Sequence, residues 1–361
     1  MFEVLKAWFF KYFGDPEAAI LLIALALGVV FIWCFGRILA PLLASIVVAY
    51  LLEGVITPLQ KRLKFSRSWA ITTVFVFFIA LLVFAVIGLL PTFSRQLSQF
   101  VAQLPATFNQ LQLFLNSLAL RYPNFLSPKV LQNLINSANF NVNALTGIGN
   151  HLLANSLESI SMVVTWVVYI LLVPLLTFFI LKDKKNLVSG VEEFMPEQRG
   201  LILEVWYEMK TLLGRYVRGK VLEVSLVTLA TWIGFSVLQL NFAFLLAFLT
   251  GLSAILPYIG LVIVTIPVTV AALLQWGVSP HFFYLMLVYA VIQVLDGNVL
   301  VPLLFSEAMN LNPVIIITAV LFFGSIWGFW GLFFAIPLAT LVKAVIQAWM
   351  RHANRTYSTN H

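Results

Sequence analysis

The stretch from Val224 to Val342 carries only two formal charges, Asp296 and Glu307. Segments of about 20 apolar residues are long enough to cross roughly 30 Å of hydrocarbon as helices. In that environment the backbone must satisfy its own hydrogen bonds, which an α-helix does within one segment. The chain is therefore predicted to be an all-α, polytopic membrane protein with about eight membrane segments, including broken or re-entrant helices in its C-terminal half.

Composition supports a membrane protein and argues against several other classes. Hydrophobic residues make up 61% and charged residues 10% of the chain, whereas soluble domains have roughly 45 to 50% apolar and about 25% charged residues. The net charge of +7 does not indicate nucleic-acid binding, because the basic residues lie beside the apolar spans, as membrane topology requires. The single cysteine, Cys34, has no intrachain partner, and no cofactor is expected.

Six apolar segments are single-span candidates, and two longer regions are interrupted by Gly and Pro. The candidates are Ala18–Phe35, Ile38–Ile56, Trp69–Leu90, Ser159–Leu181, Val221–Leu240 and Phe282–Phe305. The two interrupted regions are Phe242–Trp276 and Pro313–Val345.

Basic residues beside the short loops predict the orientation. They are Lys61, Arg62, Lys64 and Arg67, then Lys182, Lys184 and Lys185, then Arg351 and Arg355. The positive-inside rule places all three groups in the cytoplasm. Both termini are then cytoplasmic, in a multi-pass protein of the cell inner membrane. An even number of crossings follows if Pro313–Val345 is a hairpin that turns between Gly324 and Gly331.

These segments divide the chain into six parts. They are an interfacial helix with the first three spans (1–91), an extracytoplasmic helical segment (92–157), the fourth span (158–181), a cytoplasmic helical arm (182–220), a C-terminal membrane domain with helix breaks (221–350) and a basic cytoplasmic tail (351–361). In the second part, apolar residues alternate by four and three from Leu97 to Leu118, which is typical of a helix-packing seam. The seam either covers the protein's own outer face or joins subunits.

Enzymatic motifs are incomplete. The run from Gly214 to Lys220 resembles a phosphate-binding loop, but Val221 stands where a metal-contacting Ser or Thr is required. The four histidines lack metal-ligand spacing, and no serine occupies a nucleophile elbow. We therefore expect no catalytic residues, no metal site and no enzyme activity.

Asp296 is the principal candidate for a functional residue. A carboxylate inside a hydrophobic span is costly, so it is retained mainly where it pairs, faces a cavity or binds a ligand. Four other polar side chains of this half offer oxygen or amide ligands for a small polar solute, a monovalent cation or a proton: Gln239, Gln275, Gln293 and Asn298. The alternative is that Asp296 only caps a helix break at Gly297.

Glycine and proline mark the expected helix breaks. These residues are Pro257, Gly260, Gly297, Pro302, Pro313, Gly324, Gly328, Gly331 and Pro337. The spacing of Gly324 and Gly328 also suits close helix packing. A hairpin turn, helix packing and a gate that lines a pore remain alternatives for this glycine strip.

Several of these motifs together resemble a known family. The motif residues are Pro257-Tyr258-Ile259-Gly260, Asp296-Gly297-Asn298 with Pro302, Asn310-Leu311-Asn312-Pro313 and the run from Gly328 to Pro337. The chain is similar to the autoinducer-2 exporter family, and within it to the PerM-like permeases. One departure is Asn312, where many relatives carry His. If that His takes part in proton handling, its absence here would weaken a proton-coupled mechanism or move it wholly onto Asp296.

The resemblance implies a function and an assembly. It implies a permease or exporter of a small polar solute, such as an autoinducer-2-like signal. It also implies a homo-oligomer, which we expect to be a pentamer. Sodium/proton antiport is the first alternative, and a non-transporting oligomeric membrane scaffold is the second. The expected partners are the lipid bilayer, the solute or a cation, and other copies of the chain.

Overall fold

The computed structural model describes residues 16–103, 160–193, 200–305 and 311–359. Helices, turns and short connections make up this part of the chain, and it contains no strand. The predicted all-α fold is therefore confirmed. The predicted interfacial helix at the N-terminus and most of the extracytoplasmic segment lie outside the described residues.

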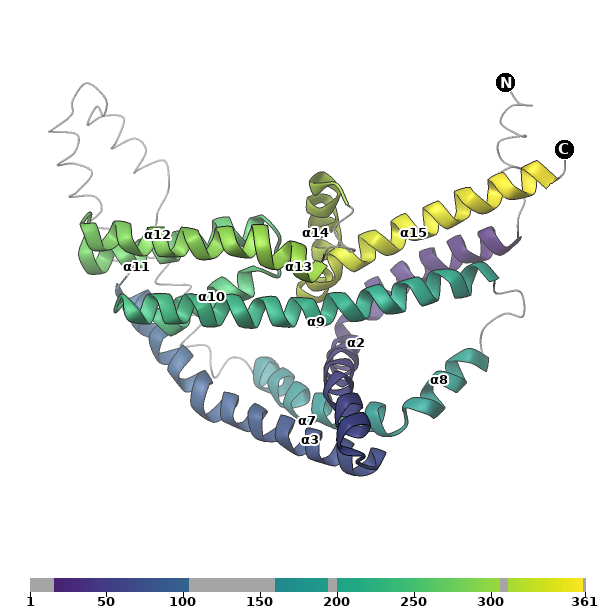
Figure 1. Cartoon of the computed structure of the whole chain (residues 1–361), viewed down its shortest axis with the longest axis horizontal. Coiled ribbons are helices and arrows are strands. Elements are labelled where there is room, and N and C mark those ends of the chain that lie inside the picture. Colours follow the sequence, from purple (N-terminus) through teal and green to yellow (C-terminus); the bar gives the residue numbers. More distant parts are fainter. Residues whose placement is uncertain (1–15, 104–159, 194–199, 306–310, 360–361) are drawn as a thin grey trace, which may run out of the picture.

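Two groups of helices form the molecule (Figure 1). The first contains α2 (Pro16–Leu63), α3 (Arg67–Phe84), the π-helical turn η1 (Ala85–Leu89), α7 (Ile160–Lys182) and α8 (Lys184–Glu193). The second contains α9 (Gly200–Val237), α10 (Ala243–Ser253), α11 (Ile259–Trp276), α12 (Pro280–Leu295), the π-helical turn η2 (Asp296–Leu300), α13 (Val301–Phe305), α14 (Pro313–Trp327) and α15 (Phe329–Thr359).

Six helical segments of the described chain are long and apolar enough to cross a membrane. They are Ile38–Leu63, Arg67–Gln103, Thr211–Val237, Ile259–Trp276, Pro280–Phe305 and Phe329–Gln347. Shorter apolar helices accompany them at Val167–Lys182, Ala243–Ser253 and Pro313–Trp327. This pattern agrees with the predicted multi-pass membrane protein.

The first two expected spans are parts of one helix. The sequence predicts separate segments on either side of Gly36 and Arg37, but α2 continues through both residues for 48 residues. A single glycine costs a helix only about 1 kcal/mol, which is too little to end it here. Gly36 instead allows close approach by Trp327 of α14, because a side chain at position 36 would overlap the indole ring.

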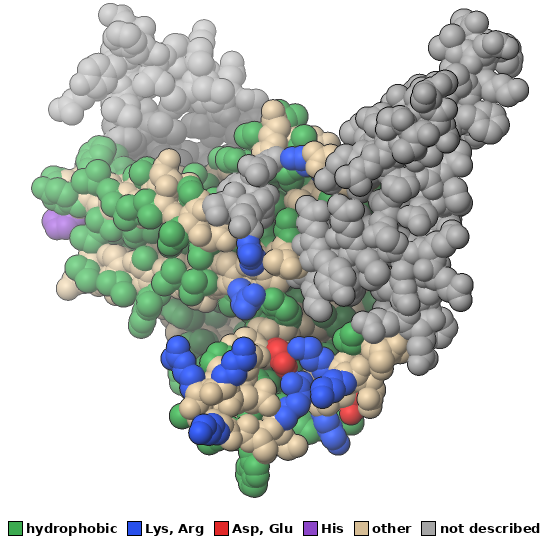
Figure 2. Space-filling model, turned by 45° about the vertical axis from the view of Figure 1, so that its right-hand side comes forward, with side chains coloured by type: hydrophobic (Ala, Val, Ile, Leu, Met, Phe, Trp, Pro, Cys, Tyr) green, Lys and Arg blue, Asp and Glu red, His purple; other side chains and the backbone are tan. Residues whose placement is uncertain are grey.

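Helices α2, α3 and α8 are joined by charged side chains around Glu53. Its Oε1 lies 3.4 Å from Arg67 Nη1 and 3.1 Å from Lys184 Nζ. Arg67 Nη2 also donates to the carbonyl of Leu181 at 3.0 Å, at the end of α7. Figure 2 shows Lys and Arg side chains gathered at this end of the molecule. These contacts fix how the four helices α2, α3, α7 and α8 meet.

Helix α9 is continuous from Gly200 to Val237. It crosses the predicted boundary at Lys220 between a cytoplasmic arm and a membrane span. Tyr216 and Val217, just before that boundary, are buried in a hydrophobic cluster with residues of α13, α14 and α15. The buried core therefore includes the part of α9 just before this boundary.

The interrupted region Phe242–Trp276 forms two helices, α10 and α11, with a break from Ala254 to Tyr258. At the N-terminal end of α10, Gln96 Oε1 accepts a hydrogen bond from Leu245 N at 2.8 Å. This bond satisfies one of the free N–H groups in the first turn of the helix. Leu97 packs against the hydrophobic cluster that α9, α10, α11 and α12 form. The rest of the predicted seam, beyond Gln103, lies outside the described residues.

Helices α14 and α15 meet at Gly328, whose φ of +60° favours glycine. Gly331 faces the backbone carbonyl of Phe323, and a Cβ there would overlap it. Gly324 faces Leu332 in the same way. Of the alternatives for the glycine strip, the structure thus contains both a turn and close helix packing.

Candidate functional site

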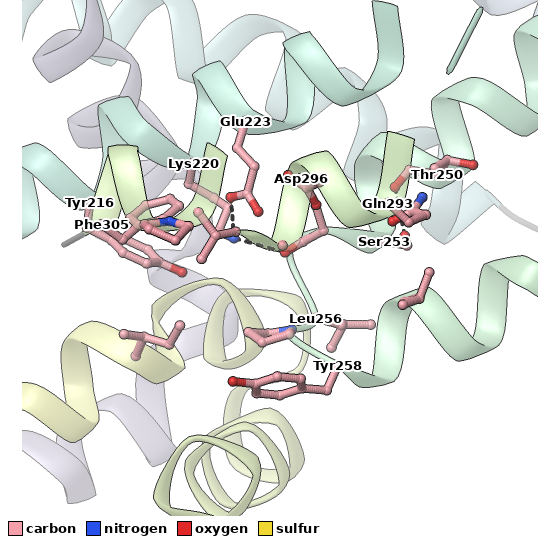
Figure 3. Close-up of a pocket in the computed structure, with 17 residues that line it drawn as sticks. Tyr216, Lys220, Glu223, Thr250, Ser253, Leu256, Tyr258, Gln293, Asp296 and Phe305 are labelled. Atoms are coloured by element: carbon pink, nitrogen blue, oxygen red, sulfur yellow. Dashed lines mark hydrogen bonds and ion pairs between the residues drawn. The ribbon is translucent and has the colours of Figure 1, made fainter. Parts of the chain in front are cut away.

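A cavity of about 250 Å³ lies between α9, α10, α11, α12, η2, α13 and α15. Its polar wall is made by Lys220 and Glu223 from α9 and by Asp296 at the start of η2 (Figure 3). Leu256 and Tyr258, from the break between α10 and α11, lie across from them. The cavity therefore opens where two helical irregularities, the α10–α11 break and the π-helical turn, face each other.

Lys220 and Glu223 form a buried ion pair. Their side chains are 4% and 3% exposed, and Lys220 Nζ lies 2.6 Å from Glu223 Oε2. The same ammonium donates to the carbonyl of Ala254 at 2.9 Å and lies 5.0 Å from the centroid of the Phe305 ring. Residues three apart share one helix face, so α9 presents both charges to the cavity together.

Asp296 and Gln293 are also three residues apart and both line the cavity. Asp296 Oδ1 and Gln293 Nε2 are buried, and neither has a hydrogen-bond partner among the described residues. Buried polar groups without partners are rare and call for a ligand, a water or another explanation. An acceptor and a donor without partners thus lie in the wall of the same cavity, and the carboxyl oxygen Oδ1 does not cap a helix break.

The backbone around Asp296 is irregular because of η2. The N–H of Val301 bonds to the carbonyl of Asp296, which is the spacing of a π-helix. Single π-helical turns inside α-helices are frequent at functional sites. Gly297 and Pro302 lie within this region and line the cavity, but the helical segment continues from Pro280 to Phe305 without a break.

The end of α10 faces the same cavity. The last carbonyls of a helix have no intrahelical partner and carry partial negative charge. Lys220 supplies both a donor and a positive charge to the carbonyl of Ala254, the residue that caps α10. The chain then turns at Tyr258, with φ of +63°, so Lys220 holds the helix end at which the break begins.

Three polar candidates from the sequence lie elsewhere. Asn298 is exposed and donates to the carbonyl of Val294 at 3.0 Å. Gln275 donates to the carbonyl of Gln239 at 2.7 Å and accepts from Asn241 N at 2.6 Å. Gln239 and Gln275 therefore close the loop between α9 and α10, where Gln239 has φ of +57°.

Other expected break positions lie in or near the hairpin of α14 and α15. Pro313 is the first residue of α14, and Asn312 Oδ1 accepts from Val314 N at 2.9 Å. Asn312, the departure from the family pattern, is therefore a helix N-cap. Helix α15 continues through Pro337.

Tyr216 explains how Pro337 is tolerated inside α15. Proline has no N–H, so it leaves the carbonyl four residues earlier, that of Phe333, without its helical donor. The buried hydroxyl of Tyr216 donates to this carbonyl at 2.9 Å. Tyr216 thereby joins α9 to α15 beside the cavity.

We expect Tyr216→Phe to lower the free energy of unfolding by about 1 to 3 kcal/mol, because a buried carbonyl loses its donor. Thermal unfolding of the purified protein in detergent measures the change. The loss should be smaller in a Pro337→Ala background, where residue 337 regains an N–H. Equal losses in both backgrounds would show that the hydroxyl does not replace the missing helical bond. Tyr284→Phe, at an exposed position, is the control.

Lys220 and Glu223 are absent from the candidates predicted from sequence. The weakly charged stretch begins at Val224, one residue after Glu223 and four residues after Lys220, and so excludes both. Their i, i+3 spacing next to an apolar run is the signal that reveals them. Within the described chain, no three His, Cys, Asp or Glu side chains gather as metal ligands, and the run from Gly214 to Lys220 lies inside α9 rather than in a phosphate-binding loop.

The sequence model described as AI-2E family transporter matches residues 21–351. The chain belongs to the AI-2E transporter family. A protein of Escherichia coli strain K12, named "Putative permease PerM", is 45% identical to this chain over 349 residues. The match covers 97% of this chain and 98% of the relative. "Putative transport protein YueF" of Bacillus subtilis strain 168 is 25% identical over 320 residues, 87% of this chain and 85% of the relative.

Family membership confirms the resemblance that the motifs around Pro257, Asp296 and Gly328 indicate. Together with the membrane-spanning helices, it makes the chain a multi-pass membrane protein of the permease or transporter class.

Proposed function

We propose that this AI-2E family protein moves a small polar solute across the membrane through the cavity beside Asp296. One observation carries the proposal. Two buried polar atoms without hydrogen-bond partners among the described residues, Asp296 Oδ1 and Gln293 Nε2, belong to residues on one wall of that cavity. An acceptor and a donor on one wall suit a solute with hydroxyl or carbonyl groups.

The size of the cavity supports a small solute. Pockets for drug-sized ligands occupy roughly 300 to 1,000 Å³, and this cavity measures about 250 Å³. Apolar side chains such as Leu261, Val301 and Ile336 form much of its remaining wall. A compact, largely uncharged signal of the autoinducer-2 type fits this description, and the family name supports the same class.

The position of the cavity at helix irregularities supports transport rather than static binding. In several secondary transporters, discontinuous helices place free backbone groups at the substrate site. Here the end of α10 and the turn η2 both border the cavity.

Sodium/proton exchange is a second candidate function, because Asp296 provides a carboxylate oxygen with no partner in the described chain. Carboxylate oxygens are ligands for hard cations, and a carboxyl also accepts and releases protons. In this case the cation itself is the transported species.

Reconstituted flux tests the proposed function. We expect proteoliposomes with the wild-type protein to move at least one member of a panel of small hydroxylated solutes, or sodium with opposite proton movement, above protein-free vesicles. Asp296→Asn should reduce that flux about tenfold or more, because a hydrogen bond to a charged group contributes roughly 1.5 to 3 kcal/mol and each 1.4 kcal/mol is about tenfold.

Two controls make the result specific. Asn298→Ala changes an exposed neighbour of the cavity and should keep wild-type flux. Size-exclusion chromatography in detergent checks that Asp296→Asn is folded. Unchanged flux in Asp296→Asn would remove this carboxyl from the mechanism, and no flux of any solute by the wild type would favour a scaffold instead.

We also infer that the protein assembles with other copies of itself in the cell inner membrane, with both termini in the cytoplasm. Family resemblance supports the oligomer, and the three basic groups beside the expected spans support the orientation. Cysteine labelling from either side of the membrane and native mass spectrometry test these two statements.

A further inference from the structure

The cavity beside Asp296 is lined by three formally charged groups. Lys220 and Glu223 come from α9, Asp296 comes from η2, and Asp296 interacts electrostatically with both others. Among the residues that the structure describes, the remaining titratable groups of the lining are the phenols of Tyr216 and Tyr258, and α10, α11, α13 and α15 add no ionisable side chain to it. With both carboxyls ionised and Lys220 cationic, this wall carries one positive and two negative charges.

Lys220 is already committed to Glu223. Its ammonium contacts Glu223 Oε2 at 2.6 Å and the carbonyl of Ala254 at 2.9 Å, so two of its three N–H groups are used. It also lies over the ring of Phe305. Moving it to Asp296 would leave Glu223 and the helix end without their partner. Within the described part of the chain, Asp296 therefore has no counter-charge of its own.

We propose that Lys220 and Glu223 set the charge count of the cavity, which is the number of positive charges that it accommodates. Because the two cancel each other, a single monovalent positive charge is accommodated beside Asp296. Its two sources are a proton on the carboxyl and an alkali cation against it. This proposal rests on the proposed role of Asp296 in transport. It specifies how many positive charges the cavity takes up in each transport cycle.

Variants of Lys220 and Glu223 are expected to change the number of positive charges that the cavity accommodates. Glu223→Gln frees Lys220 to pair with Asp296, so the cavity is neutral without an occupant. Lys220→Met leaves two carboxyls that share one low-dielectric space and raises the requirement to two positive charges. The double variant Lys220→Met/Glu223→Gln returns the count to one. Lys220→Arg keeps the charge and serves as the conservative control.

Infrared spectroscopy of the purified full-length protein measures the count directly. At neutral pH in a choline buffer without alkali cations, exposed carboxyls are ionised, so the protonated-carboxyl band reports buried groups. We expect this band in the wild type, in Lys220→Arg and in the double variant, and its loss in Asp296→Asn and Glu223→Gln. Lys220→Met should show about twice the wild-type intensity, because two carboxyls then share the space.

Replacing choline chloride with sodium chloride separates the two sources of charge. Loss of the wild-type band in sodium identifies an alkali cation as the occupant, and a persistent band identifies the proton. Should Lys220→Met fail to fold, Glu223→Gln and the double variant still decide the result. A wild-type band in Glu223→Gln, or no band in the wild type in choline buffer, overturns the proposal.

The spectroscopic result does not depend on flux. If the band pattern follows the charge count while no solute moves in vesicles, the proposed transport function is wrong and the charge count stands. If solute moves and Glu223→Gln keeps the wild-type band, transport stands and the charge count is wrong.

Discussion

Replacing Gly260 with alanine is expected to disrupt the α10–α11 unit and with it the cavity. A Cβ at this position would overlap the carbonyl group of Ser253, which is backbone at the end of α10. Backbone atoms cannot rotate aside as a flexible side chain can, so the break between the helices must open. Overpacking in a well-packed interior costs about 1 to 3 kcal/mol, and occasionally more.

Gly297→Ala is the matched control, because Gly297 also lines the cavity but has open space around its Cβ position. Alanine also has the higher helix propensity, by about 1 kcal/mol. We therefore expect a lowered unfolding temperature and lost flux in Gly260→Ala, with near-wild-type values in Gly297→Ala. Equal behaviour of the two variants would show that the close approach of Gly260 to Ser253 does not hold this region.

Lys220→Met alone is expected to destabilise the protein by about 3 to 5 kcal/mol, the usual cost of removing one partner from a buried ion pair. Glu223, whose side chain is 3% exposed, would lose its counter-charge and would have to bind a proton to stay buried. The carbonyl of Ala254 would lose a donor in the same variant. Chemical or thermal unfolding in detergent measures both effects together.

The double variant Lys220→Met/Glu223→Gln separates the two effects. Removing both charges should restore most of the loss, and what remains measures the contact with the end of α10. If the double variant is as unstable as Lys220→Met, the carbonyl contact and packing dominate and the ion pair contributes little. Lys184→Met, in an exposed pair with Glu53, should change stability by less than about 1 kcal/mol.

Local signals explain what could be predicted about the fold. Long apolar runs predict the membrane helices, and the cluster Pro257 to Gly260 predicts the break before α11, because these features depend only on neighbouring residues. The turn at Gly328 follows in the same way. Gly36 with Arg37 is an exception, since the tertiary contact with Trp327 and the low cost of one glycine keep α2 continuous.

The residues around the cavity depend on contacts between distant segments. Gln239 and Gln275 bond to each other across 36 positions, and no periodic pattern reveals that contact. Asn298 lies two residues from Asp296, yet the helix directs it away from the cavity. Lys220 and Glu223 require knowledge that α9 continues as one helix into the core, which a boundary drawn at a charge cluster conceals.

The continuity of α9 also has a mechanical consequence. From Gly200 to Lys220 the helix measures about 30 Å at roughly 1.5 Å per residue, and it contains no break in that distance. It therefore transmits a tilt along its length as one rigid helix. A tilt of its first turns rotates Lys220 and Glu223 relative to Asp296, so a force applied far from the cavity reaches its charged wall through one rigid element.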